Sequence, residues 1–457
     1  MNSDPKVVTR FAPSPTGYKH VGNYRTALFD YIYAKQHGGS FVLRIEDTDK
    51  ARNKPEFEQN IYDTLNWLGL SYDKVYIQTK NIDTQRTYLK QLIEKGLAYV
   101  SPEEAKDGSG KINELIRFNN PNEKVSFTDL IRGTVEMDTT DLGDFIIAKN
   151  IDEPIFHFAV VVDDFDAGVT HILRGEDHIS NTPRHVLIQR ALGAPTPIYA
   201  HFPLVNAPDR TKLSSRKGAA HPTQYMEKGY LPIGLINYLC LLGWHPVGDN
   251  EVLTLEEIIA QFDLSKVQKA SAIFDEVRLK WFNKEHCKRL SDAEYTEWVM
   301  KFLPTKYQEF VKNSDILTRL MPTLREKISY FGELAEMEET GDLEYFFMKP
   351  SYDTALLLCP EKLRKGKDVT IKDLDPIFTR TSELLSSIEA SDWTAEKIKE
   401  ILWPYADETG RGLVLWALRA ALSGKEKSPD PFVLSYIVGK DETLARISKA
   451  QQLVHEA

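Results

Sequence analysis

The chain has 457 residues, and its 57 Lys and Arg against 67 Asp and Glu give a net charge of −10 at pH 7. With 42% hydrophobic and 27% charged residues, the composition is that of a globular protein and excludes a disordered or collagen-like chain. The acidic balance argues against binding nucleic acid through overall charge, although cations gathered on one face remain compatible with it. At ~150 residues per domain, the length predicts about three domains.

The chain start and the cysteines bear on location. Met1–Pro5 and the residues after it have neither the apolar core of a signal peptide nor the Arg-rich helix of a transit peptide. No apolar run is long enough to cross a bilayer. Cys240, Cys287 and Cys359 are far apart and belong to no motif, so we interpret them as reduced thiols. We therefore expect a cytoplasmic protein with no membrane partner.

A strand, a polar turn and a helix open the chain. The apolar run Val7–Ala12 predicts a buried strand, prolines and Gly17 break it, and a helix is predicted from about Asn23. This order is typical of a nucleotide-binding α/β unit, whose helix N-terminus offers N–H groups to a phosphate. His20 would add a donor, and Gly22 would let a purine lie against backbone. The competing interpretation is that His20 only caps the helix.

Alternating patterns continue along the chain and predict an α/β fold class with a helical C-terminal region. Further strands are predicted at 41–45, 75–78, 134–137, 145–149, 158–162 and 169–173, and helices at 56–68, 84–95 and 235–242. We divide the chain into a first half of a parallel sheet at 1–83, an insertion at 84–156, a second half at 157–193, a mixed region at 194–305 and a helical region at 306–457.

A basic loop far downstream complements the opening turn. The stretch Asp209–Gly218 has four cations, little apolar content and a terminal glycine, so it is predicted to be an exposed loop. Such a loop can close over a triphosphate and neutralise the charge that develops on departing diphosphate. Each segment alone has an ordinary structural explanation, but the pair in this order is far more specific.

Together these motifs resemble a known family. The segment from Pro13 to Gly22 resembles the HIGH motif of class I aminoacyl-tRNA synthetases in its glutamyl form, P-S-P-T-G-x-x-H-x-G, and the basic loop resembles their KMSKS motif. Leu43–Asp49, Phe158–Asp164 and Leu173–His178 followed by Ser180–Pro183 also match. The chain therefore resembles bacterial glutamyl-tRNA synthetases. The resemblance implies a class I Rossmann-like catalytic domain, an inserted domain for the tRNA acceptor end, a stem-contact region with the basic loop, and an all-α anticodon-binding region.

The resemblance also assigns residues for ATP, which would enter as its Mg²⁺ complex. It implies catalytic roles for His20, Gly22, Asn23, Lys212, Ser214 and Arg216. It implies ATP contacts from Thr16, Gly17, His20, Gly22, Glu176, Lys212, Leu213 and Ser215. The chain departs from the family at Ser215, where the second lysine of KMSKS usually stands. Arg216 or Lys217 would take over its phosphate contact.

The substrate must offer two carboxylates and one ammonium. An arginine at a strand end, such as Arg10 or Arg174, can grip a carboxylate, and Glu46 can accept an ammonium. By resemblance the glutamate contacts are Arg10, Ala12, Ser14, Glu46, Phe156 and Arg174, with Phe156 where the family usually has a tyrosine. The alternative for Arg10 and Glu46 is an ion pair with each other.

Metal sites are not expected. Glu46, Asp47 and Asp49 could be read as metal ligands, but alternate strand residues face opposite ways, so salt links to Arg44, Lys50 and Arg52 are favoured. Some relatives carry zinc in the insertion, whereas residues 84–156 of this chain include no cysteine. We therefore predict no metal ligands and no structural zinc.

The C-terminal region combines aromatic and basic side chains of the kind that hold single-stranded RNA, although a tryptophan at helical spacing is more often a core residue. These residues are Trp393, Trp403, Arg411, Trp416, Arg419, Lys425 and Lys427. The resemblance implies a monomeric enzyme that ligates L-glutamate to tRNA(Glu) through a glutamyl-adenylate, with L-glutamate, ATP and tRNA(Glu) as partners. The alternatives are an enzyme that also charges tRNA(Gln), a paralogue that glutamylates another tRNA, and a nucleotidyltransferase or non-catalytic RNA-binding relative.

Overall fold

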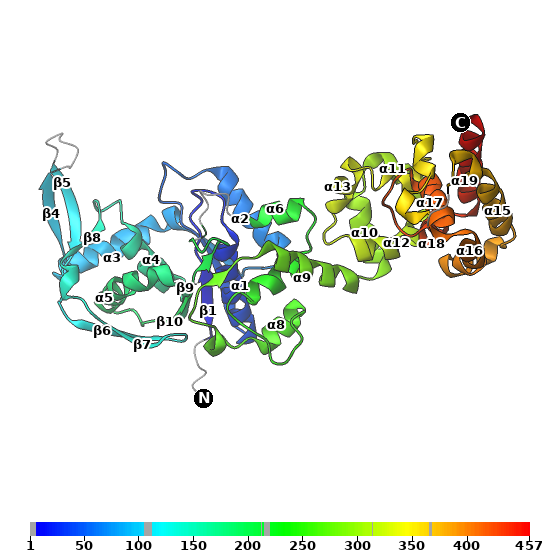
Figure 1. The fold of residues 1–457 in the computed structure, drawn as a ribbon. Coiled ribbons are helices and arrows are strands. Elements are labelled where there is room, and N and C mark those ends of the chain that lie inside the picture. The colour runs from blue at the N-terminus through cyan, green and yellow to red at the C-terminus, as the bar shows by residue number, and fades with distance from the viewer. Residues whose placement is uncertain (1–5, 105–111, 212, 214–219, 313, 365–367) are drawn as a thin grey trace. The chain divides into compact units, whose positions relative to one another are not determined.

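The computed structural model describes residues 6–104, 112–211, 213, 220–312, 314–364 and 368–457. The chain divides into two compact units, Met1–His286 and Cys287–Ala457. The first unit mixes strands and helices, and the second is built from helices (Figure 1). Each unit is described by itself below.

Parallel strands form the centre of the first unit. The strands are β1 (Val8–Phe11), β2 (Ser40–Ile45), β3 (Lys74–Ile77), β4 (Ala98–Glu104), β5 (Ile112–Phe118), β6 (Lys124–Asp129), β7 (Gly133–Asp138), β8 (Phe145–Ala148), β9 (His171–Gly175), β10 (Ile198–Phe202), β11 (Val205–Asn206) and β12 (Ala272–Ile273). β1, β2 and β3 pair in parallel in that order. β9, β10 and β6 also pair in parallel, and β7 closes the edge as the antiparallel partner of β6.

The two parallel groups meet where β1 lies beside β9. The backbone N–H of Thr170 donates to the carbonyl of Val8 at 3.0 Å, and the Val8 N–H donates to the Thr170 hydroxyl at 2.8 Å. The resulting order is β3-β2-β1-β9-β10-β6-β7. Chain direction of travel across the sheet reverses between β1 and β9, and ligands of such sheets bind at the carboxyl ends of the strands at this point.

Helices of the first unit connect and cover these strands. They are α1 (Val21–Gln36), α2 (Pro55–Trp67), α3 (Ile82–Glu94), α4 (Phe156–Asp166), α5 (Thr182–Leu192), α6 (Pro222–Glu227), α7 (Pro232–Cys240), α8 (Leu255–Gln261) and α9 (Glu276–Arg289), which runs on into the second unit. The apolar face predicted for α1, with Ala27, Leu28, Tyr31 and Ile32, is buried as expected.

One predicted element is wrong. Residues 158–162, expected to be a parallel strand, belong to helix α4. Phe158 and Val162 are wholly buried, and α4 packs into a core shared with α3, α5 and the sheet. A short, uniformly apolar run has the same pattern whether it is a strand buried on both faces or a helix buried all round. Tertiary packing selects the helix.

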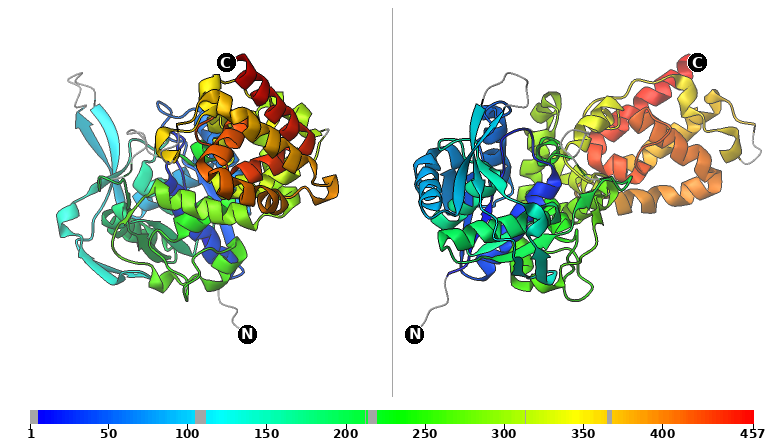
Figure 2. Two further views of the ribbon diagram at one scale, coloured as in Figure 1. Left: turned by 45° about the vertical axis from the view of Figure 1, so that its right-hand side comes forward. Right: turned by 90° about the vertical axis from the view of Figure 1, so that its left-hand side faces the viewer.

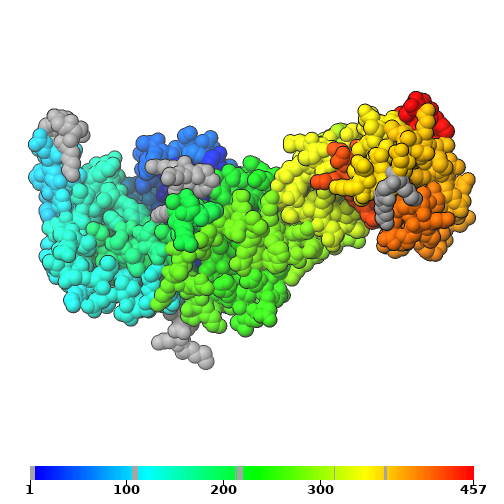
Figure 3. All heavy atoms as spheres, viewed as in Figure 1, coloured from blue at the N-terminus to red at the C-terminus, as the bar shows by residue number. Residues whose placement is uncertain are grey.

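The predicted insertion is divided between two sheets. β4, β5 and β8 form an antiparallel sheet, and the β4–β5 hairpin projects from the unit (Figure 3). The β6–β7 hairpin instead extends the parallel sheet through β10, where Asp129 is opposite Tyr199. The segment between α3 and α4 therefore contributes directly to the edge of the catalytic sheet.

The described residues of the second unit contain helices and no strand, as predicted (Figure 2). These helices are α10 (Asp292–Phe302), α11 (Thr305–Lys312), α12 (Ile316–Lys327), α13 (Glu333–Glu339), α14 (Glu344–Phe347), α15 (Asp375–Ser386), α16 (Ala395–Thr409), α17 (Arg411–Ser423), α18 (Pro431–Val438) and α19 (Lys440–Glu456). Ser291 and Glu294 begin α10 with reciprocal side-chain-to-backbone bonds, a capping box.

Candidate active site

A cavity of about 380 Å³ lies at the carboxyl ends of β1 and β9, beside the N-terminus of α1. It brings together most of the residues predicted for catalysis and substrate binding. These are Arg10, Ala12, Ser14, His20, Gly22, Asn23, Glu46, Phe156, Arg174 and Leu213. Thr16, Gly17 and Glu176 do not line it. Lys212, Ser214, Ser215 and Arg216 lie outside the described residues.

The start of α1 presents its N-terminus to this cavity. His20 occupies the N-cap position, but its side chain makes no capping hydrogen bond, so the capping alternative does not explain it. A Cβ on Gly22 would lie 3.0 Å from the His20 ring atoms Cε1 and Nδ1. Gly22 therefore makes room for the His20 imidazole, rather than directly for a purine as the sequence suggested. The N–H groups of the first turn remain suited to a phosphate.

Lys19 is a further cation of the cavity that the sequence reasoning missed. Burial lowers the pKa of its ammonium, while the charge of Glu46 opposes this shift. Its signal in the sequence was its place beside His20 within the opening motif. A second cation beside the α1 N-terminus adds to the positive potential there, which favours an anionic ligand.

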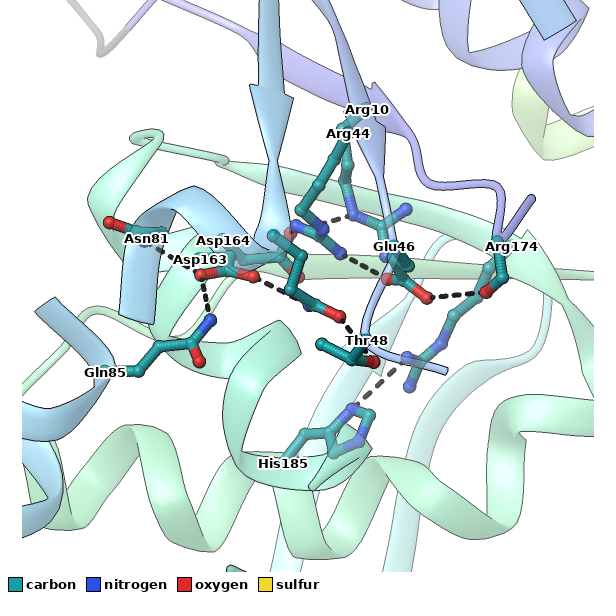
Figure 4. A network of polar contacts seen from close by, with 12 residues as sticks. Arg10, Arg44, Glu46, Thr48, Asn81, Gln85, Asp163, Asp164, Arg174 and His185 are labelled. Carbon is teal, nitrogen blue, oxygen red and sulfur yellow. Dashed lines mark hydrogen bonds and ion pairs between the residues drawn. The ribbon is translucent and has the colours of Figure 1, made fainter. Parts of the chain in front are cut away.

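Two arginines and two carboxylates form a buried ion-pair lattice on one side of the cavity (Figure 4). Arg10 Nε lies 3.1 Å from Asp164 Oδ1, Arg44 pairs with the same oxygen, and Arg44 Nη2 lies 3.2 Å from Glu46 Oε1. The Ser14 hydroxyl is 3.5 Å from Glu46 Oε2. The alternative of a direct Arg10–Glu46 ion pair is therefore wrong, because Arg10 pairs with Asp164.

The pKa values of the lattice follow from burial and charge. Burial raises the pKa of Asp164, but the charges of Arg44 and Arg10 outweigh it and hold that pKa below its usual value. For Glu46, burial prevails over Arg44 and Arg10 and raises the pKa. Burial lowers the pKa of Arg44, yet Asp164 and Glu46 together raise it above its ordinary value. Both arginines of the lattice thus stay charged beside anionic partners.

Asp163, the neighbour of Asp164, anchors α4 to α3. Its carboxylate accepts hydrogen bonds from Gln78, Asn81 and Gln85 at 2.7, 2.8 and 2.8 Å. Burial raises the pKa of this carboxyl. Because a buried carboxylate is costly without partners, these three amides keep it satisfied. The anchor determines where Asp164 meets the arginines (Figure 4).

Arg174 lies on the other side of the cavity in a different environment. Its guanidinium is buried, and it has no carboxylate within 4 Å among the described residues. Its Nε donates to His201 Nε2 at 3.2 Å, Nη1 to His185 Nδ1 at 3.2 Å, and Nη2 to the Thr182 hydroxyl at 2.8 Å. Burial lowers the pKa of Arg174 to about 10, since no adjacent anion offsets the loss of water.

Glu176, predicted to contact ATP, has another role in this structure. Its Oε1 accepts from the Leu204 N–H at 3.0 Å, and its Oε2 pairs with Arg132 of the β6–β7 turn. Both carboxylate oxygens thus have protein partners. The side chain connects the end of β9 with the turn at the sheet edge.

The acidic residues after β2 do not form a metal cluster. Asp49 pairs with Arg52 at 2.6 Å, as the salt-link interpretation predicted, and Asp47 accepts from the Thr79 N–H at 2.8 Å. Arg44, expected in the same links, instead points into the lattice. Within the described part of the chain, no group of three or more His, Cys, Asp or Glu residues could hold a metal ion.

The aromatic and basic residues of the second unit fall into two groups. Trp393 is buried and donates its indole N–H to Ser435 at 3.1 Å, so it is a core residue. Arg411 lies 4.5 Å from the Trp403 ring centroid, and Arg419 lies 4.8 Å from that of Trp416. The paired cations and rings are the better candidates for contact with RNA.

Comparison with known proteins identifies the class to which this site belongs. Residues 6–107 and 100–281 match the catalytic domain of class I tRNA synthetases (E and Q), and residues 294–451 match an anticodon binding domain. With the switch-point cavity, these matches define a class I aminoacyl-tRNA synthetase. Since the catalytic match alone spans more than half of the chain, the protein belongs to the class I synthetase family for glutamate and glutamine.

Two solved structures resemble the chain along its whole length. One is a glutamate tRNA ligase from Elizabethkingia meningosepticum CCUG26117 in complex with its amino acid, 29% identical, with a TM-score of 0.82 and coverage of 98% of this chain and 99% of that chain. The other is a glutamate-tRNA synthetase from Elizabethkingia anophelis, 30% identical, with a TM-score of 0.82 and coverage of 98% and 100%. No helix among the described residues is long and apolar enough to span a membrane.

Proposed function

We propose that the protein ligates L-glutamate to the 3′ end of tRNA(Glu) in two steps. The glutamate α-carboxylate attacks the α-phosphorus of ATP to form glutamyl-adenylate and release diphosphate. The terminal ribose hydroxyl of tRNA then attacks the activated carbonyl and releases AMP. Little covalent chemistry is asked of the protein, so positioning and charge stabilisation carry the rate.

The observation that carries this proposal is the composition of one cavity. It combines a helix N-terminus with His20 and Lys19, suited to phosphates, with Arg174 and Arg10, suited to carboxylates, and Glu46, suited to an ammonium. A glutamate and the phosphates of ATP together require these three kinds of group. Mg²⁺ would enter with ATP, held through phosphate oxygens and water.

The basic loop, from Asp209 to Gly218, is assigned its part from the sequence. Lys212 and Arg216 would neutralise the diphosphate as it leaves, with Ser214 and Ser215 between them, and Leu213 already lines the cavity. Replacing Lys212 with alanine should lower kcat for glutamate activation more than it changes the KM for glutamate, because the contact acts on the transition state. Equal losses in the two constants would place the lysine in ground-state binding instead.

Full aminoacylation assays test the proposal and its alternatives. Labelled glutamate and glutamine are offered with purified tRNA(Glu) and tRNA(Gln). We expect glutamate on tRNA(Glu); glutamate on both tRNAs would show a non-discriminating enzyme, and glutamate on neither would leave a paralogue acting on another tRNA. The matched anticodon binding domain favours the first two outcomes over the third. We further propose that the enzyme acts as a monomer in the cytoplasm, which sedimentation and fractionation measure.

Activation is proposed to depend on tRNA. Binding of the acceptor end can shift ATP and the basic loop into the productive arrangement, an induced fit used for specificity. Ser215 leaves the loop one lysine short of the family pattern, so this chain should rely on tRNA at least as much as its relatives. Diphosphate exchange with and without tRNA(Glu) measures the dependence, and equal rates would refute it.

A further inference from the structure

The surroundings of Arg174 form a continuous chain of hydrogen bonds across four elements. It runs from Asp129 at the end of β6 to His201 on β10, then to Arg174 on β9, His185 on α5 and His157 at the start of α4. The His201 Nδ1–Asp129 Oδ2 distance is 2.6 Å, and His185 Nε2 lies 3.2 Å from His157 Nδ1. Asp129 and His201 are wholly or almost wholly buried, as is His185.

The chemistry of these groups determines where each proton lies. Arginine only donates hydrogen bonds, so His201 Nε2 and His185 Nδ1 must both be unprotonated acceptors. A neutral imidazole then carries its proton on the other nitrogen. His201 therefore donates from Nδ1 to Asp129, and His185 donates from Nε2 to His157. Each ring is neutral and is held in a single tautomer by the partner behind it.

This arrangement leaves Arg174 with donors to spare. Of the five N–H bonds of a guanidinium, three go to His201, His185 and Thr182. One N–H on each terminal nitrogen has no partner among the described residues, and the side chain lines the cavity. Two parallel N–H groups are what a carboxylate accepts from an arginine. Neutral partners orient the guanidinium without cancelling its charge.

We propose that Asp129, His201, His185 and His157 are positioning residues that hold Arg174, through unprotonated ring nitrogens, to receive a carboxylate of the substrate. Asp129 sets the tautomer of His201, and His157 sets that of His185. The inference deepens the proposed function and rests on it for the identity of the substrate. It explains why a buried cation with no carboxylate beside it is retained in this cavity.

Matched variants separate an acceptor nitrogen from a ring of the right shape. His201→Phe keeps the ring that stacks on Tyr199 but removes the acceptor, whereas His201→Gln keeps an acceptor oxygen near the position of Nε2. His185→Leu and His185→Asn make the same comparison at the other terminal nitrogen. Asp129→Asn keeps the shape but would donate to His201 Nδ1, turning an N–H toward Arg174. His171→Phe, at another buried histidine of β9, is the control.

The readout is the KM for glutamate against the KM for ATP in tRNA(Glu) aminoacylation. His201→Phe, His185→Leu and Asp129→Asn should raise the glutamate KM about tenfold or more while the ATP KM stays within about twofold, as for partners that orient a binding group. His201→Gln and His185→Asn should recover most of the loss, and His171→Phe should match wild type. Unchanged glutamate KM in the two apolar variants, or equal loss for ATP, would overturn the proposal.

A second measurement on the unaltered full chain needs no substrate. Nitrogen-15 NMR of the histidine rings should show His201 protonated at Nδ1 alone and His185 at Nε2 alone at pH 7. The opposite tautomers, or charged rings, would overturn the cradle whatever the enzyme acts on. If wild-type protein does not use glutamate but shows these tautomers, the proposed function fails while the geometry of the cradle stands.

Discussion

Arg10 and Arg174 lie on the neighbouring strands β1 and β9 and line the same cavity, yet their partners differ in kind. Arg10 contacts a carboxylate, Asp164, which also pairs with Arg44. Arg174 contacts two imidazoles and a hydroxyl. A buried ion pair balances its own charge and depends on both members, whereas a buried cation among neutral acceptors keeps its charge for a ligand. The comparison teaches that the lattice serves mainly to assemble the cavity and Arg174 to read the substrate.

Loss of the shared carboxylate should have the largest effect on stability. Asp164→Asn leaves Arg10 and Arg44 buried with one carboxylate between them and should lower the free energy of unfolding by about 3–5 kcal/mol. Urea titration of the full chain measures this. Asp49→Asn, which breaks the exposed pair with Arg52, is the matched control and should cost about 0–1 kcal/mol. Equal costs for the two changes would remove the structural role of the lattice.

Replacing the other arginine should affect the reaction instead. Arg174→Met removes a cation with no anionic partner and should lower kcat/KM for glutamate by about 2–4 kcal/mol in transition-state binding. Its unfolding free energy should fall less than that of Asp164→Asn. Steady-state kinetics and urea titration of both variants make the comparison. A variant with near-normal glutamate kinetics and a large loss of stability would reverse the roles given to the two sides.

The ionisation of the histidines sharpens the comparison further. Burial, with the charges of Arg184 and Arg174, lowers the pKa of His157 from 6.5 to about 4, and burial with Arg174 lowers that of His178 to about 4. Both rings are then neutral at pH 7. The unfolded chain binds these protons more readily, so their contribution to stability is complete above pH 6.5 and is lost as the pH falls toward 4. NMR titration of the rings checks this, and midpoints near 6.5 would contradict it.

The smallest expected effect comes from Phe156 at the start of α4. Its ring lies 5.9 Å from that of His185 and lines the cavity on the Arg174 side. Phe156→Tyr restores the hydroxyl usual in the family and should lower the glutamate KM by no more than about tenfold, the range of one added hydrogen bond. A raised glutamate KM would show that the hydroxyl meets no substrate oxygen. Glutamine kinetics serve as the control.

The sequence predicts the strands and helices around the opening turn well because local signals there agree. The turn prolines, the strand ends and the amphipathic face of α1 all point to one arrangement, and the structure confirms it. Helix α4 was mistaken for a strand because its run of buried residues has no period to read. Uniform burial is a tertiary property, and it depends on α3, α5 and the sheet packing around it.

The same limit applies within the site. Arg10, Glu46 and Arg174 were identified because they stand at predicted strand ends beside a motif. Asp164 and His201 could not be given their roles, since their partners are distant in the chain: Arg10 and Asp164 are 154 residues apart, and His201 and Asp129 are 72 apart. Their signal was present only as carboxylates and histidines at the ends of quoted motifs and strands.

The structure of the protein with glutamate bound tests the central claim most directly. The account predicts that one substrate carboxylate accepts hydrogen bonds from both terminal nitrogens of Arg174, with His201 and His185 still in place behind it. The ammonium should lie near Glu46, and the Arg10–Asp164 pair should remain intact. A glutamate whose carboxylates both bind elsewhere, with Arg174 contacting only the protein, would contradict the account.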